Sequence, residues 1–222
     1  TGLTIKTTAN TTTDSDSTDT TDNTSTSAKA LKAGNEVNIS VGEFKIDSAD
    51  DSVYSNGNIV ITGGNISVAS GDNGMHADGN LTISDGTVDI TKSYEGIEGA
   101  IVTIDGGTIS VVASDDGINC AGGSDTGSTD RMGADQFSSQ DGVELNINGG
   151  TVTIDAEGDG LDSNGNFTMA GGTVCVCGPT NGGNGALDYN GTATVTGGTL
   201  IACGAVGMEE GFGDSSTQYS VL

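Results

Sequence analysis

Acidic and amide side chains recur in this sequence within one short motif. In residues 114–120, two aspartates are followed by a glycine, an isoleucine and an asparagine. A similar order of polar, small, apolar and polar residues recurs in segments 49–54, 71–76, 93–98 and 157–162, and more weakly in 185–188. If the chain winds as a solenoid, these segments stack and their acids form rows along one edge. Because carboxylate and amide oxygens suit Ca²⁺, we predict a calcium-binding edge.

Like charges in such rows would repel each other strongly. Stacked strands lie about 4.8 Å apart, and at that spacing each pair of carboxylates costs about 3.5 kcal/mol at an effective dielectric constant of about 20. The whole chain has only six Lys and Arg residues to offset this. We therefore predict a set of calcium ligands, the alternative being a solvated edge without a specific ion: Asp72, Asn73, Glu95, Glu98, Asp115, Asp116, Asn119, Asp159, Asp162 and Asp188.

The elements that would position these acids form a repeat of about 22 residues. A glycine marks each repeat, just before its second apolar segment: Gly42, Gly64, Gly86, Gly107, Gly150, Gly172 and Gly198. Successive glycines are 21 or 22 residues apart except for gaps of 43 and 26, which predict an inserted loop at 122–142 and a smaller insertion near 178–181. Such glycines are expected at corners with positive φ.

Apolar residues within each repeat alternate with polar ones, which is the period of a β-strand. One repeat supplies five inward positions over three short strands, namely Ile59, Ile61, Ile66, Val68 and Met75. Hairpins in a sandwich would not place the same residue type at the same phase of every repeat. We predict an all-β, right-handed, single-stranded parallel β-helix of about seven to eight coils, with no helix.

Two regions are expected. Residues 1–33 would hold a first strand containing Leu3 and Ile5, followed by a Thr/Ser/Asp-rich loop or linker. Residues 34–222 would form the parallel β-helix, with the inserted loop at 122–142. The periodic apolar residues favour an ordered chain over a disordered one.

The formal net charge of −25 restricts the partners. It argues against nucleic acid and anionic membranes, and it favours cations or neutral partners approached through cations. We expect no signal peptide and no apolar run that would span a bilayer, and the start at Thr1 without Met predicts either a mature form or a recombinant product. The composition favours an extracellular or cell-surface location.

The four cysteines do not form a zinc-type pair. Cys177 and Cys203 share an outward column on neighbouring repeats, where the Cα separation would suit a disulfide. Whether this disulfide forms is left open by the sequence, and Cys120 and Cys175 are expected to be free.

Four segments carry a family resemblance: DNGMHADGNLTIS, ITKSYEGIEGA, ASDDGINCAGG and AEGDGLDSNGN. They resemble the secreted clostridial carbohydrate-binding β-helix proteins, which are similar to polysaccharide lyases. Over residues 28–218 the resemblance implies binding of cellulose, pectin and calcium, without established catalysis. It does not assign individual ligands, and the acid-rich insertion departs from the Gly-rich loop expected of relatives.

We therefore expect a calcium-dependent protein that binds a plant cell-wall polysaccharide, either a glucan or a polyuronate. Calcium on the acidic edge would bridge to sugar hydroxyls or uronate carboxylates. The chain has no Trp, so the rings offered to sugars would be those of Tyr54, Tyr94 and Tyr189.

Two other functions stay open. A structural or adhesive solenoid would associate end to end unless a segment such as residues 207–212 capped it. A calcium-dependent polysaccharide lyase would need a base, for which only Arg131 and Lys92 are candidates, so catalysis is uncertain. The single histidine, His76, is expected to be a ladder residue.

Overall fold

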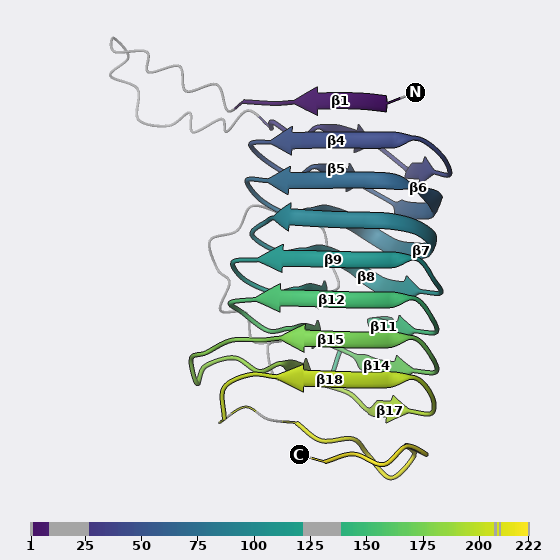
Figure 1. Ribbon diagram of the computed structural model, residues 1–222, viewed down its shortest axis with the longest axis vertical. Helices are drawn as coiled ribbons and strands as arrows, with labels where there is room; N and C mark the ends of the chain where they lie inside the picture. The colour runs from purple at the N-terminus through teal and green to yellow at the C-terminus, as the bar shows by residue number, and fades with distance from the viewer. Residues whose placement is uncertain (1, 9–26, 122–138, 207, 209, 222) are drawn as a thin grey trace.

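The computed structural model describes residues 2–8, 27–121, 139–206, 208 and 210–221. These residues form eighteen strands joined by turns, with no helix among them and therefore none that would cross a bilayer. The strands wind into a right-handed parallel β-solenoid of about seven coils, because the chain runs left along the front, returns to the right behind and descends (Figure 1). The predicted fold class is confirmed.

Three parallel sheets run the length of the solenoid, and each coil contributes one segment to each sheet. The first-strand sheet comprises β3 (Glu36–Ile39), the first part of β6 (Asn58–Ser70), the middle of β7 (Met75–Lys92), the end of β8 (Ile97–Ile104), β11 (Glu144–Ile147), β14 (Asn166–Met169) and β17 (Ala193–Val195).

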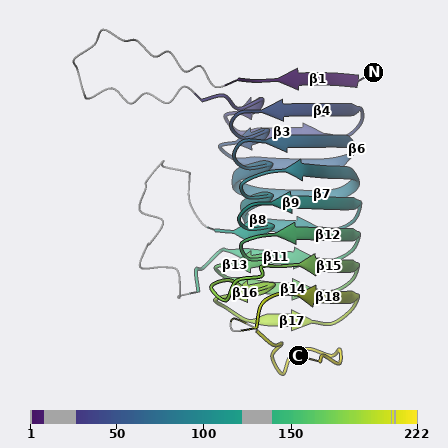
Figure 2. The same cartoon turned by 60° about the vertical axis from the view of Figure 1, so that its left-hand side comes forward.

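The second-strand sheet faces the viewer in Figure 1. It comprises β1 (Gly2–Lys6), β4 (Glu43–Ser48), the ends of β6 and β7, β9 (Thr108–Ala113), β12 (Thr151–Ala156), β15 (Thr173–Cys177) and β18 (Thr199–Cys203). The third-strand sheet has the shortest segments, seen partly in Figure 2: β2 (Leu31–Ala33), β5 (Val53–Ser55), the starts of β7 and β8, β10 (Ile118–Cys120), β13 (Leu161–Ser163) and β16 (Leu187–Tyr189).

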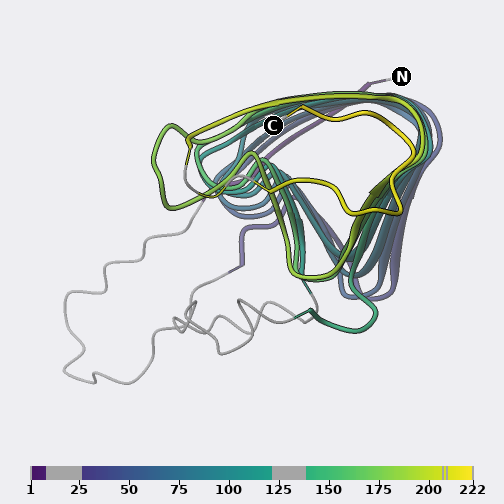
Figure 3. The same ribbon diagram turned by 90° about the horizontal axis from the view of Figure 1, so that it is seen from below.

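The register of these sheets places identical phases of the repeat on top of one another. Ile61 pairs with Ile83, which pairs with Ile104 on the next coil, and all three are fully buried. The coils superpose when viewed along the axis (Figure 3). The core is therefore one stack of inward aliphatic side chains, each contributing roughly 1.5–3 kcal/mol on burial.

The marker glycines occupy the corners before the second-strand sheet. All seven have positive φ, between 81° and 115°. At Gly150 an added Cβ would also lie 2.9 Å from a backbone carbon of the preceding coil. Both the left-handed conformation and the close coil spacing therefore require glycine there.

The ends of the solenoid are partly as expected. β1 pairs in register with β4, which confirms a strand around Leu3 and Ile5. At the other end, the backbone N–H groups of Gly213 and Thr217 donate to carbonyls of β17, so the C-terminal segment covers the edge of the last coil. The predicted Thr-rich tract lies largely, and the inserted loop mostly, outside the described residues.

Candidate metal centre on the acidic edge

The predicted acids do line one edge of the solenoid. An outward column of the third-strand sheet pairs in register from coil to coil and contains Tyr54, His76, Glu98, Asn119, Asp162 and Asp188. The turns before these strands also stack, since the N–H of Gly96 donates to the carbonyl of Asp116 and that of Gly117 to the carbonyl of Asp159. We call this surface the acidic edge.

The C-terminal half of the acidic edge gathers three carboxyl groups. Asp116, Asp159 and Asp162 offer oxygen atoms that all lie within 4.8 Å of one another. The backbone holds two of them in place, because the N–H of Asp159 donates to Asp116 Oδ1 at 2.7 Å and the N–H of Gly185 donates to Asp159 Oδ1. We call these three residues the lower triad.

Burial and mutual repulsion disfavour the charged forms of this triad. Burial is the largest cause in each case, and it raises the pKa of Asp116 to about 8, of Asp159 to about 6 and of Asp162 to about 9. The negative charges of Asp115, Asp188 and Glu95 add to these shifts. Of the described residues, no Lys or His lies within ion-pair distance of the triad.

Two further observations fit a cation at the lower triad. Asn119 donates from Nδ2 to Glu95 Oε1 at 3.3 Å, yet its Oδ1 is buried without a hydrogen-bond partner among the described residues. An added Cβ on Gly158 would lie 2.5 Å from Asp116 Oδ1 and 2.6 Å from Asp115 Oδ1, so glycine leaves the space that these carboxylates occupy. Oxygen donors of this kind, without a thiolate, are those that Ca²⁺ prefers in proteins.

A second triad lies at the N-terminal end of the edge and contains its own cation. Oxygen atoms of Asp50, Asp51 and Asp72 also lie within 4.8 Å of one another. Lys29 Nζ forms ion pairs with Asp50 Oδ1 at 3.1 Å and with Asp51 Oδ2, and the Lys29 side chain is only 11% exposed. Burial alone would lower the pKa of Lys29, but these two carboxylates raise it. We call this group the upper triad.

Between the triads, His76 and Asn73 contact the acids of the edge. His76 is buried, with Nδ1 3.1 Å from Glu98 Oε2 and Nε2 3.3 Å from Asp78 Oδ1. Asn73 Nδ2 also donates to Glu98 Oε2. Of the predicted ligands, Asp72, Asn73 and Glu98 therefore lie with the upper triad or His76, while the others lie near the lower triad: Glu95, Asp115, Asp116, Asn119, Asp159, Asp162 and Asp188.

The tyrosines differ in what they offer to a sugar. Tyr54 is only 6% exposed and its ring packs edge-on against His76, with the Lys29 ammonium 4.4 Å from the ring centroid. The expectation that Tyr54 presents a ring face to a sugar is therefore not supported by its burial. Tyr94 is half-buried in a turn of the edge. Tyr189 pairs with the buried Ser163, packs against the core and donates its hydroxyl to the Gly211 carbonyl, so the expectation that it offers a ring face to a sugar is not supported either.

Three residues of the edge were absent from the sequence-based site. Lys29 is 22 residues before Asp51 and shares its phase, so the repeat itself could have revealed it. Asp78 comes just after a third strand. Glu210 comes from the C-terminal segment, which lacks the repeat, and its Oε2 accepts the N–H of Tyr189 at 3.1 Å. Burial and the charges of Asp188 and Asp159 raise the pKa of Glu210, so it extends the acidic edge.

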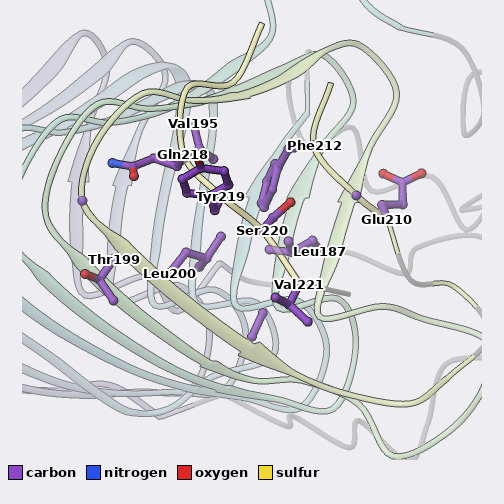
Figure 4. A pocket seen from close by; sticks show the side chains of 13 residues that line it. Leu187, Val195, Thr199, Leu200, Glu210, Phe212, Gln218, Tyr219, Ser220 and Val221 are labelled. Carbon is purple, nitrogen blue, oxygen red and sulfur yellow. The ribbon is translucent and has the colours of Figure 1, made fainter. Parts of the chain in front are cut away.

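A cavity of about 430 Å³ lies between the last coil and the C-terminal segment (Figure 4). Its lining mixes apolar side chains, such as Leu187 and Phe212, with polar ones, such as Gln218 and Ser220, and Glu210 lies at one side.

The fold and its edge define the class of this molecule as a parallel β-solenoid with a row of crowded carboxyl groups. A family model described as carbohydrate-binding domain-containing protein matches residues 1–74 and 75–185. The chain belongs to this carbohydrate-binding family. No curated protein and no solved structure shows a significant match to the chain.

Proposed function

We propose that this protein is an extracellular, calcium-dependent polysaccharide-binding protein that acts without catalysis. Membership of a carbohydrate-binding family supports a polysaccharide as the partner. The lower triad supports calcium as the cofactor, and the acidic, Lys-poor composition supports an extracellular location.

The observation that carries the calcium part is the contrast between the two triads. The upper triad is neutralised by the ammonium group of Lys29, whereas the described residues supply no such group to the lower triad. Both triads lie on the same edge of the solenoid, on different coils. A divalent cation bound by Asp116, Asp159 and Asp162 would neutralise the lower triad, as the ammonium group of Lys29 neutralises the upper triad.

Asp116, Asp159 and Asp162 would hold the ion, with Asn119 Oδ1 as a further oxygen nearby. Calcium takes six to eight oxygen ligands, so positions beyond these would be open to sugar hydroxyls or uronate carboxylates. Tyr94 lies in a turn of this edge, one coil before Asp115, because its carbonyl accepts the Asp115 N–H. A plant cell-wall glucan or a polyuronate fits this arrangement.

The test separates the ion from the sugar. Calorimetric titration of the EDTA-treated protein with Ca²⁺ should show saturable binding, and affinity electrophoresis through polygalacturonate or soluble glucan should show retardation with calcium but not with EDTA. Retardation that persists in EDTA would contradict calcium dependence. An absence of retardation in all polymers would contradict polysaccharide binding. An increase in absorbance from unsaturated sugar products would contradict the absence of catalysis.

A further inference from the structure

Two cysteines face solvent side by side on the last two rungs of the second-strand sheet. Cys177 of β15 pairs in register with Cys203 of β18, and both residues are exposed and carry free thiols. The N–H of Gly178 donates to the carbonyl of Cys203 at 2.7 Å, which fixes the two strands together at this point. The acidic edge does not use these residues.

The spacing of parallel strands suits a covalent bond here. Neighbouring strands lie about 4.7–4.9 Å apart, and disulfides usually join Cα atoms about 4.4–6.8 Å apart. Side chains at paired positions of a parallel sheet point to the same face, so both sulfur atoms lie above the second-strand sheet. A bond between them requires rotation about side-chain bonds but no shift of the backbone.

The other two cysteines have no cysteine at the paired position. Cys175 pairs with Thr153 and Ile201, and Cys120, which is fully buried, pairs with Gly99 and Ser163. In the described part of the chain, the groups of three residues able to hold a metal contain only aspartates. The exposed pair is therefore placed for a disulfide and not for a three-ligand metal site.

We propose that Cys177 and Cys203 form a disulfide when the protein meets a small-molecule disulfide such as oxidised glutathione. One protein thiolate attacks a sulfur of the small disulfide, whose S–S bond breaks and releases one small thiol. The second protein thiolate then attacks the protein-bound sulfur of this mixed disulfide and displaces the second small thiol. The protein loses two electrons and two protons, and the two small thiols carry them away.

The bond would close one complete coil of the solenoid into a covalent ring. This ring contains β16 and β17. Asp188 of the acidic edge is part of β16 and therefore lies within the ring. Solenoids contact only their neighbouring repeats, so local opening is expected to begin at an end. The disulfide would restrain local opening of the last coil, which precedes Glu210 in the chain.

The experiment oxidises the folded, full-length chain with excess oxidised glutathione and compares it with the reduced protein. We expect a loss of two of the four titratable thiols, a single Cys177–Cys203 linked peptide in mass spectra without reduction, and a midpoint of thermal unfolding that is higher by roughly 5–10 °C. Amide hydrogen exchange in β17 and β18 should become slower in the oxidised protein.

The matched variants are Cys177→Ser, Cys203→Ser and Cys175→Ser. The first two should lose both the linked peptide and the thermal shift, whereas Cys175→Ser should keep both. Four free thiols after oxidation, or a linked product that persists in Cys177→Ser or is lost in Cys175→Ser, would overturn the proposal. A linked peptide without slower exchange in β18 would overturn its structural consequence.

Discussion

The N–H of Asp159 donates to the side-chain Oδ1 of Asp116 at 2.7 Å, although 43 residues separate them. The two aspartates occupy the same position on successive coils. One oxygen of Asp116 therefore orders the turn of the following coil, while the carboxyl group as a whole lies against the other acids of the lower triad. In the proposed function the same side chain would also hold the ion, and the two roles can be separated by mutation.

Replacement of Asp162 by Asn should weaken calcium binding at least tenfold, because it removes one charged oxygen ligand while it preserves size and shape. Combining it with Asp116→Asn, which keeps an oxygen to accept the Asp159 N–H, should abolish calcium binding in the micromolar range. Calorimetric titration measures both effects. Asp155→Asn, an exposed position on β12, serves as the control and should leave the affinity unchanged. Equal affinities for all variants would place the ion elsewhere.

Stability without calcium should decrease as pH rises. The pKa values of Asp116 and Asp162 increase from 3.8 to about 8 and about 9 on folding, so between these limits the folded state binds more protons than the unfolded state. The contribution of these two groups to the free energy of unfolding is fully present below about pH 4 and is lost as pH rises through 8 to 9. Thermal unfolding at pH 5, 7 and 9 in EDTA should show this decline, and saturating calcium should remove it. A flat profile in EDTA would contradict the crowding of these carboxyl groups.

Lys29→Met should destabilise the protein by about 3 kcal/mol, because it leaves Asp50 and Asp51 without their buried partner. If Lys29 acts in place of a metal ion, millimolar calcium should recover part of this loss and the stoichiometry of calcium binding should increase by one. Chemical unfolding and calorimetric titration measure these changes. Lys92→Met changes an exposed lysine and should have little effect. A destabilisation that calcium leaves unaltered would contradict the equivalence of the two cations.

Gly117→Ala should destabilise the solenoid by about 2–3 kcal/mol, because the added Cβ would lie 2.3 Å from Ile154 Cγ2 and 2.5 Å from the Gly160 carbonyl oxygen. Gly34→Ala is the matched control, since nothing lies within 4 Å of the added atom. Its free energy of unfolding should change by less than about 0.5 kcal/mol. Similar losses in both variants would contradict a steric role for the glycine of the motif.

The fold was predictable because the same phase of each repeat carries the same kind of residue. Ile61, Ile83 and Ile104 could be assigned to one column before any coordinates, and the marker glycines fixed the corners. The right register follows automatically, since a slip would turn every inward aliphatic outward.

The sequence predicted that the acids lie along one edge, but not which of their side chains come together. Which acids meet depends on side-chain direction, and this is set by neighbours that the repeat does not specify. Lys29 divides the acids into a neutralised group and a crowded one, and Tyr54 is buried because Lys29 and His76 pack against its ring. Glu210 joins the edge from a segment outside the repeat. Single-copy residues such as these decide the chemistry, and periodicity alone cannot place them.

The position of Lys29 gives the molecule an inherent direction of disassembly. Its ammonium group is covalently attached to the chain, so the coils around Asp50 and Asp51 keep their neutralising charge whatever the medium contains. The coils around Asp116 and Asp162 would depend on the supply of ions. Dialysis against a chelator should therefore fray this solenoid from its C-terminal end, and a protease added during dialysis should leave an N-terminal remnant.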